Sequence, residues 1–270
     1  MYGYGMFLST NGIIASSAGG FDADAQSFFT ATGITDTTQM SAINQFVLDL
    51  KSNSLWSLGK YMYLGFLGSA SKVKYNLFNP SAYQLTLSSG WTYDSQGMQG
   101  NGSSAYARTG FIPSGNTDKN SQSIGVYSQT DVDEFAISIG SLDASTSVRE
   151  YMIIKTSAYA NIQLAAKGNY TSTGGVSDSR GFFLISRNSS SSFKMYKRAS
   201  TILTNTTPET TYDLGIEDYL NALNYSGTPL YYSGRKISLY FRFTGLNDTQ
   251  AGNLNTITNT MLNSLGITTY

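Results

Sequence analysis

The chain has 270 residues, 13% charged residues and a formal net charge of zero, and it contains neither cysteine nor histidine. Zero net charge gives no long-range attraction to nucleic acid or to an anionic membrane, so neither is expected as a partner. Without cysteine and histidine there can be no disulfide framework, Cys nucleophile, Ser-His-Asp triad or His/Cys zinc site, which leaves carboxylates, Tyr, Lys and hydroxyls for chemistry.

Residues 1–27 are predicted to form an extended assembly leader. The segment carries no charge before Asp22 and lacks the basic start and compact apolar core of a Sec-type signal peptide. A stretch this apolar needs to be covered, and we expect it to add a strand to a neighbouring protein. The alternative is that it folds back on its own domain as an edge strand. Its anchoring side chains would be Tyr2, Tyr4, Phe7, Leu8, Ile13 and Ile14.

Residues 28–60 are predicted to form a helical preamble. Asp36 is a suitable N-cap, and the helix is expected to end near Asn53. The apolar residues between them recur at spacings of three and four and therefore share one helix face: Met40, Ile43, Phe46, Val47 and Leu50. The following YMYLGFLG (61–68) is short, apolar and interrupted by glycine, as in a buried strand or a tight crossover.

From Lys72 to about Arg242 the sequence is typical of β-structure. Turn signals recur roughly every 8 to 14 residues, which is the spacing of a sandwich or barrel rather than of βαβ units. The predicted strands are 72–77, 84–88, 105–109, 123–129, 135–141, 149–156, 162–168, 181–187, 192–200, 213–217 and 235–243.

The chain closes with a second predicted helix, capped by Asn247 or Asp248. Its apolar stripe consists of Leu254, Ile257, Met261 and Leu265. Many Thr and Asn residues lie in this helix and are poor helix formers, so packing on the sandwich must hold it. Because the composition does not change along this part of the chain, residues 61–270 are predicted to form one domain.

The segment GWTYDSQGMQGNGSSAYARTGFIPS (90–114) is rich in glycine, which raises the question of a phosphate-binding loop. Such a loop needs a helix after it to supply unpaired N–H groups, and no helical periodicity follows here. Asn101 and Gly102 both tolerate positive φ, so the segment is predicted to be a hairpin turn followed by the strand 105–109.

Acidic residues cluster in DVDEF (131–135). Jelly-roll glucanases carry alternating carboxylates on one strand, where they serve as nucleophile and general acid. Here Asp131 and Asp133 share a face, but Glu134 points the other way and no third acid follows. We therefore expect a polar turn, with hydrolysis through these three residues as the alternative. Asp131 and Asp133 are also the candidate ligands for calcium, and no other cofactor is expected.

Basic and aromatic residues alternate in SDSRGFFLISRNSSSSFKMYKRAS (177–200), a pattern that also occurs in nucleic-acid-binding proteins. The neutral composition and the NSSSS hairpin tip favour solvated strand faces instead. Tyr rings can bury the C–H surface of a sugar while Asp and Arg satisfy its hydroxyls. The candidates for ligand contact are Tyr93, Asp94, Tyr106, Asp178 and Arg180.

Three stretches taken together, residues 75–114, 178–207 and 230–267, resemble a known family. In their order along the chain they are similar to the concanavalin A-like, LamG-type jelly-roll modules of tailed-bacteriophage virion proteins, and residues 28–56 resemble the helical segment that often precedes such modules. The resemblance implies a mainly β fold, a jelly-roll sandwich of two antiparallel sheets with an N-terminal helix and a C-terminal helix.

The same resemblance implies a non-enzymatic virion surface protein, such as a fibre, tail-tip or capsid-decoration subunit, made in the bacterial host cytoplasm. It further implies a homotrimer that is joined to other virion proteins through the leader. Related folds bind glycans, so lectin-like binding to host-surface sugars during adsorption and a purely structural role both stay open. The alternative function is that of a carbohydrate-active enzyme of the same fold, a glycan hydrolase or depolymerase.

Overall fold

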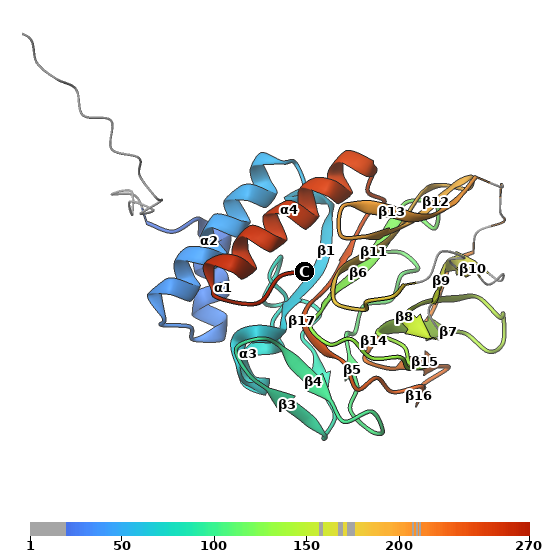
Figure 1. The fold of residues 1–270 in the computed structure, drawn as a ribbon, viewed down its shortest axis with the longest axis horizontal. Helices are drawn as coiled ribbons and strands as arrows, with labels where there is room; N and C mark the ends of the chain where they lie inside the picture. Colours follow the sequence, from blue (N-terminus) through green and yellow to red (C-terminus); the bar gives the residue numbers. More distant parts are fainter. Residues whose placement is uncertain are drawn as a thin grey trace, which may run out of the picture.

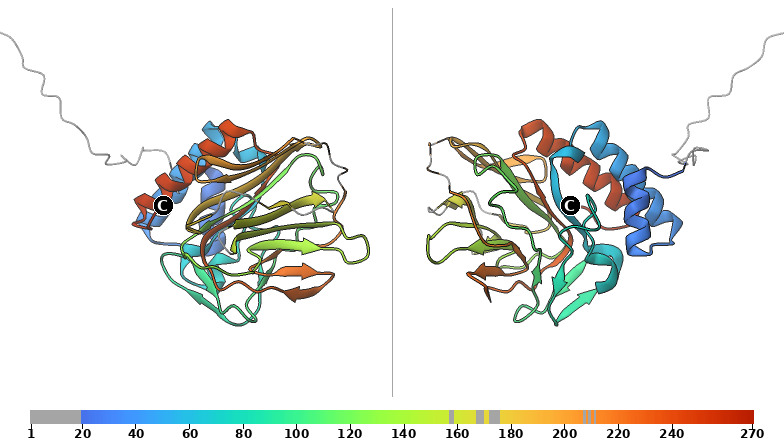
Figure 2. Two further views of the ribbon diagram at one scale, coloured as in Figure 1. Left: turned by 45° about the vertical axis from the view of Figure 1, so that its right-hand side comes forward. Right: turned by 180° about the vertical axis from the view of Figure 1, so that it is seen from behind.

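The computed structural model describes residues 20–156, 159–166, 170–171, 176–206, 208, 210 and 212–270. Within these residues the chain forms two β-sheets in two layers, and the longer helices lie together on one side of the molecule (Figures 1 and 2). Side chains from both sheets and from the helices share a large hydrophobic core. In this part of the chain no helix is both long and apolar enough to cross a membrane.

One sheet, here called sheet A, has the strand order β13-β12-β11-β6-β17-β4-β3 in the described residues, with β1 also paired to β17. All of its pairings are antiparallel. Its strands are β1 (Gly59–Leu64), β3 (Trp91–Tyr93), β4 (Met98–Gly100), β6 (Gln122–Ser128), β11 (Gly181–Ser189), β12 (Ser192–Lys197), β13 (Ser200–Asn205) and β17 (Lys236–Phe243).

The other sheet, sheet B, has the order β10-β9-β8-β7-β14-β5-β2 in the same residues, with β15 beside β7 and β16 beside β15. Its pairings are antiparallel except that of β15 with β7. Its strands are β2 (Thr86–Leu87), β5 (Ala107–Arg108), β7 (Ile139–Leu142), β8 (Arg149–Thr156), β9 (Tyr159–Ala166), β10 (Tyr170–Thr171), β14 (Tyr219–Leu220), β15 (Leu223–Tyr225) and β16 (Thr228–Leu230).

The helical elements are α1 (Ala23–Thr32), α2 (Thr37–Ser52), η1 (Trp56–Leu58), η2 (Gly65–Leu67), α3 (Ala70–Val73) and α4 (Asp248–Ser264). The predicted caps are confirmed: Asp36 accepts the Gln39 N–H at 2.7 Å, and Asn247 forms a capping box with Gln250. The start of α1 was not predicted, because this helix begins at Ala23, inside the segment expected to be an extended leader, and continues into the predicted helical preamble.

The helices pack on the outer face of sheet A. The buried stripe of α2 is made of Ala42, Ile43, Phe46, Val47 and Leu50, close to the predicted set. From α4, Asn259 accepts the Tyr127 hydroxyl of β6 at 2.9 Å, and Asp248 accepts the Tyr196 hydroxyl of β12 at 2.7 Å. Side chains of sheet A thus contact the helices on one face and sheet B on the other.

Several predicted strands are wrong in detail. Residues 72–77 contain the end of α3 and a turn, residues 213–217 precede the short strand β14, and the strand predicted at 135–141 begins only at Ile139. The turn at Asn101 is confirmed, since its Oδ1 atom accepts the N–H groups of Ser103, Ser104 and Ala105. It is not a hairpin, however, because β4 before it belongs to sheet A and β5 after it to sheet B.

Candidate functional site

The residues predicted to contact a ligand do not gather at one place. Tyr93 ends β3, and Asp94 begins the turn to β4. There the Asp94 carboxylate accepts the Gln96 N–H at 2.8 Å and pairs with Lys236. These contacts fix the turn of the β3–β4 hairpin, so Asp94 has a structural role in this conformation.

Tyr106, Asp178 and Arg180 lie elsewhere. The Tyr106 ring packs against Tyr219 of sheet B, with centroids 5.1 Å apart. Asp178 and Arg180 precede β11 and pair at 2.9 Å, and the Arg180 guanidinium lies over the Tyr270 ring. Among the described residues, no hydrogen bond, ion pair or ring contact joins Tyr106 to the Asp178–Arg180 pair, or either of them to Asp94, so the predicted set is not a single site.

Two of the three acids in the segment 131–135, Asp131 and Glu134, make structural contacts. The Asp131 carboxylate accepts the Ser179 N–H and the Lys155 ammonium, both at 2.9 Å, and these bonds lower the pKa of Asp131 to about 2. Glu134 pairs with Arg235 at 3.1 Å and accepts the Ser233 hydroxyl. No group of three or more His, Cys, Asp or Glu side chains suited to a metal ion occurs in the described part of the chain.

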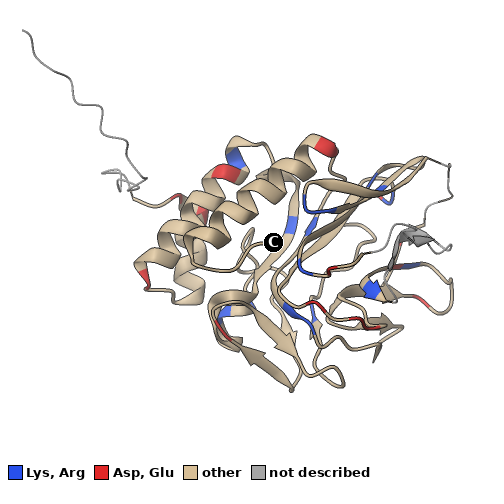
Figure 3. Cartoon of the chain, viewed as in Figure 1, with Lys and Arg blue, Asp and Glu red and all other residues tan. Residues whose placement is uncertain are grey.

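The basic residues of the 177–200 segment are not all on solvated strand faces. Arg187 is completely buried, with its guanidinium 5.0 Å from the Phe193 ring centroid, and burial lowers its pKa to about 10. Lys194 reaches Asp248 of α4 at 2.7 Å. Over the described residues, Lys and Arg lie interspersed with Asp and Glu (Figure 3).

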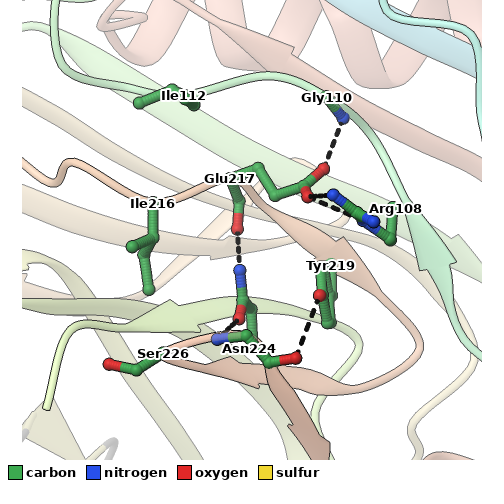
Figure 4. Close-up of a pocket in the computed structure, with 9 residues that line it drawn as sticks. Arg108, Gly110, Ile112, Ile216, Glu217, Tyr219, Asn224 and Ser226 are labelled. Carbon is green, nitrogen blue, oxygen red and sulfur yellow. Dashed lines mark hydrogen bonds and ion pairs between the residues drawn. The ribbon is translucent and has the colours of Figure 1, made fainter.

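An open hollow of about 580 Å³ lies on sheet B beside β5 and β14 (Figure 4). Its walls come from three stretches that are far apart in the sequence: residues 108–112, 216–219 and 224–227. Ile112 and Ile216 lie at the end away from Arg108 (Figure 4). The end of the hollow away from Arg108 therefore combines apolar surface with the Ser226 hydroxyl (Figure 4).

Glu217 holds the three stretches of this hollow together. Its carboxylate accepts the Arg108 Nε–H and the Gly110 N–H, each at 2.7 Å (Figure 4). Its main-chain carbonyl accepts the Asn224 Nδ2–H at 2.8 Å, and Asn224 Oδ1 accepts the Gly227 N–H at 2.6 Å. These bonds fix the positions of the three stretches relative to one another.

The ion pair makes the hollow electrically neutral. The hydrogen bond and the charge of Glu217 raise the pKa of Arg108 above its ordinary value. The Arg108 side chain is 54% exposed but that of Glu217 only 13%, so a ligand would meet the guanidinium rather than the carboxylate. A guanidinium has five N–H donors, more than Glu217 uses. The hollow thus suits an uncharged ligand that accepts hydrogen bonds.

Behind the hollow, a charged cluster is buried between the two sheets. Arg242 of β17 contacts Glu150 of β8 and lies 3.0 Å from Asp218, and all three side chains are inaccessible to solvent. Tyr61 donates its hydroxyl to Asp218 at 2.8 Å, and Arg242 donates to Gln122 at 3.0 Å. Asp218 directly follows Glu217 in the sequence. The Asp218 carboxylate faces the interior, and the Glu217 carboxylate faces the hollow.

Burial dominates the titration of this cluster. It raises the pKa of Asp218 to about 7, although hydrogen bonds from Tyr61 and Ser141 act in the opposite direction. Sequence reasoning singled out neither Glu217 nor Asp218. The available signal was the pair of adjacent acids between the apolar residues Ile216 and Leu220, which predicts that one acid faces inward.

No protein-family model matches the chain, and no curated protein sequence is significantly similar to it. Its fold is similar to part of Trypanosoma rangeli sialidase. A structure of that enzyme in complex with sialic acid gives a TM-score of 0.55 at 10% identity, covering 82% of this chain and 39% of the sialidase. A mutant of the same enzyme that displays trans-sialidase activity gives a TM-score of 0.55 at 10% identity, covering 83% and 39%. The chain thus spans about two fifths of the sialidases it matches.

These matches correct the interpretation of the sequence. The resemblance to bacteriophage virion modules and the virion surface function that it implied are wrong, because the fold is shared with solved sialidase structures. The mainly β fold of two sheets with helices at both ends of the described chain is confirmed. The leader residues Tyr2, Tyr4, Phe7, Leu8, Ile13 and Ile14 lie outside the described residues, so their role in assembly and the homotrimer stay predictions.

Proposed function

We propose that the chain is a carbohydrate-binding β-sandwich of the concanavalin A-like, lectin-like type, and that the hollow beside Arg108 is its sugar site. The neutral Arg108–Glu217 pair inside this hollow is the main support. The fold likeness to a sialidase that was solved with sialic acid supports carbohydrate as the ligand class.

The chemistry of the hollow matches a saccharide. The remaining N–H donors of Arg108 and the Ser226 hydroxyl can bond to sugar hydroxyls, while Ile112 and Ile216 can cover C–H surface. A volume of about 580 Å³ accommodates one or two sugar rings. Because Glu217 neutralises Arg108, a sugar without charge is favoured.

The test is a glycan array with the full chain, followed by calorimetry on the glycans that bind. Arg108→Gln should weaken binding by about tenfold, as expected when a charged hydrogen-bond donor is lost. Arg149→Gln, at the start of β8 and outside the hollow, is the matched control and should bind like the unmodified chain. A blank array, or equal binding by Arg108→Gln, would refute the proposal.

We propose binding without catalysis. Most glycoside hydrolases use two carboxylates that flank the scissile bond, whereas Glu217 is the one carboxylate among the residues lining the hollow and is already held by Arg108 and Gly110. The tyrosine–carboxylate pair Tyr61 and Asp218 is completely buried, where no substrate reaches it.

Glycan hydrolysis is the second candidate function, because solved sialidase structures share the fold. It is tested with 4-methylumbelliferyl glycosides, the sialoside included. We expect no release of the fluorophore above the blank. Release that disappears in Glu217→Gln would instead establish hydrolysis at the hollow.

A further inference from the structure

We propose that a second hollow, at the start of β1, binds a saccharide residue that carries a carboxylate, and that Lys60 is its cation. This hollow has a volume of about 380 Å³ and includes Trp56, Lys60 and Phe78 among its lining residues. The proposal takes only the ligand class from the proposed function, since it concerns different residues and a ligand of different charge.

Aromatic rings form the walls of this hollow. The Trp56 and Phe78 rings meet at 62° with centroids 4.9 Å apart, and the Tyr83 ring packs on Phe111 at 5.0 Å. Trp56, Phe78 and Tyr83 are only half-buried, so part of each ring stays open to solvent. A sugar ring placed there would cover this aromatic surface with its C–H groups.

Gly59 permits this arrangement. A Cβ atom at position 59 would overlap the Phe78 ring, which therefore lies directly on the main chain at the start of β1. Gly59 thus brings the ring next to the neighbouring Lys60, and both residues line the hollow.

Two exposed asparagines supply neutral polar groups. Asn79 uses its Oδ1 atom to accept the Ser81 N–H at 3.0 Å, which leaves its Nδ2 group for a ligand. Asn116 accepts the Tyr83 hydroxyl at 3.0 Å and so holds that side chain at the rim of the hollow. A ligand therefore meets aromatic surface, the Nδ2 group of Asn79 and one ammonium group.

Lys60 is the one charged side chain among the lining residues, and it forms no ion pair with any described residue. The contrast is Lys51, whose ammonium lies over the Trp56 ring but pairs with Asp22 and Asp24, each at 2.6 Å. The hollow thus has an uncompensated positive charge beside aromatic rings. A sugar carboxylate would pair with Lys60 through a charge-assisted hydrogen bond.

The first experiment compares glucuronate with glucose, which share a ring but differ in charge. Binding to the full chain is followed by saturation-transfer NMR and calorimetry. Glucuronate should bind about tenfold more tightly than glucose, and the difference should shrink as salt is added. Equal binding of the two sugars would overturn the proposal.

Single substitutions test whether glucuronate binds in this hollow. Lys60→Gln should remove the preference for glucuronate. Asn79→Asp should do the same, because it keeps the acceptor for the Ser81 N–H while adding a negative charge. Lys72→Gln, on α3 and outside the hollow, is the control and should leave the preference intact. Unchanged glucuronate binding in both Lys60→Gln and Asn79→Asp would overturn the proposal.

The two proposed sugar sites can be refuted independently of each other. If neutral glycans do not bind beside Arg108, the proposed function falls, but a glucuronate preference that depends on Lys60 would still support this hollow. If glucuronate binding depends on Arg108 and not on Lys60, the acidic sugar occupies the hollow on sheet B and this proposal is wrong.

Discussion

The Nε atom of Arg242 lies 3.0 Å from the Asp218 carboxylate, and both side chains are completely buried between the two sheets. Glu150, equally buried, contacts the same guanidinium. A guanidinium stays charged at any ordinary pH, so this cluster is neutral only when one of its two carboxylates holds a proton. A buried site favours the neutral state because an uncompensated charge is costly there.

Folding stability should therefore fall as the pH rises from about 5 to about 7. The pKa of Asp218 is about 7 in the folded chain, above the ordinary value of 3.8, so between these values the folded state binds more protons than the unfolded state. Its stabilising contribution is complete below about pH 4 and is lost as the pH rises through about 7. Urea unfolding should show a decrease on the order of 2 kcal/mol over this window.

The composition makes this measurement specific. The chain has no histidine and no cysteine, so no other side chain with an ordinary pKa titrates between pH 5 and 7. In the Asp218→Asn variant the side chain cannot ionise. The free energy of unfolding of this variant should therefore change little between pH 5 and pH 7, whether the variant is more or less stable than the unmodified chain. If the two chains lose stability in parallel, Asp218 is not the responsible group.

Replacing Arg242 should be far more damaging than replacing an arginine on the surface. Arg242→Met leaves Asp218 and Glu150 without their cation, and breaking a buried pair in this way costs about 3 to 5 kcal/mol. Arg108→Met also removes an ion pair, but the Arg108 side chain is 54% exposed, so a loss of at most about 1 kcal/mol is expected. Chemical denaturation of both variants at pH 7 measures the two losses in free energy of unfolding. Similar losses in the two would contradict the buried-cluster argument.

The long elements of the fold could be predicted because each carries its own pattern. The stripe of α2 and the apolar runs of β6, β8, β11 and β17 are local signals, and all five elements formed where expected. The two- and three-residue strands of sheet B have no such pattern, since distant pairing partners define them. Polar and apolar residues alternate over residues 72–77 as they do in a strand. In the structure, however, Val73 is a buried residue of the short helix α3, and Leu77 is a buried residue of the turn that follows it.

The candidate site was harder to predict than the fold. Arg108 and Glu217 are 109 positions apart, and only the pairing of β14 with β5 brings them together. In RKISLYFRF (235–243), alternation cannot distinguish an arginine that faces solvent from one that is buried. Arg235 and Arg242 are both completely buried, because sheet B or a loop covers the face that they occupy.

Two glycine replacements should change stability in opposite directions. A Cβ atom at Gly97 would lie 2.6 Å from the Ile237 carbonyl oxygen, so Gly97→Ala must push β4 away from β17 and should cost about 1 to 3 kcal/mol. Gly252 lies within α4, with nothing within 4 Å of the corresponding position, so Gly252→Ala should gain about 0.5 to 1 kcal/mol. Thermal unfolding by calorimetry measures both. A stable Gly97→Ala would show that the hairpin can shift freely.

Finally, α4 should depend on docking rather than on its own helical propensity. Leu254 is completely buried against the core, so Leu254→Ala should cost about 2 to 5 kcal/mol by leaving a cavity. Thr256 is exposed on the same helix, and Thr256→Ala should be neutral or gain about 0.5 kcal/mol because alanine is the better helix former. A synthetic peptide of residues 247–266 should show little helical circular dichroism in water, since a short helix rich in Thr and Asn lacks the packing that stabilises it here. A strongly helical peptide, or a small effect of Leu254→Ala, would mean that α4 forms independently of sheet A.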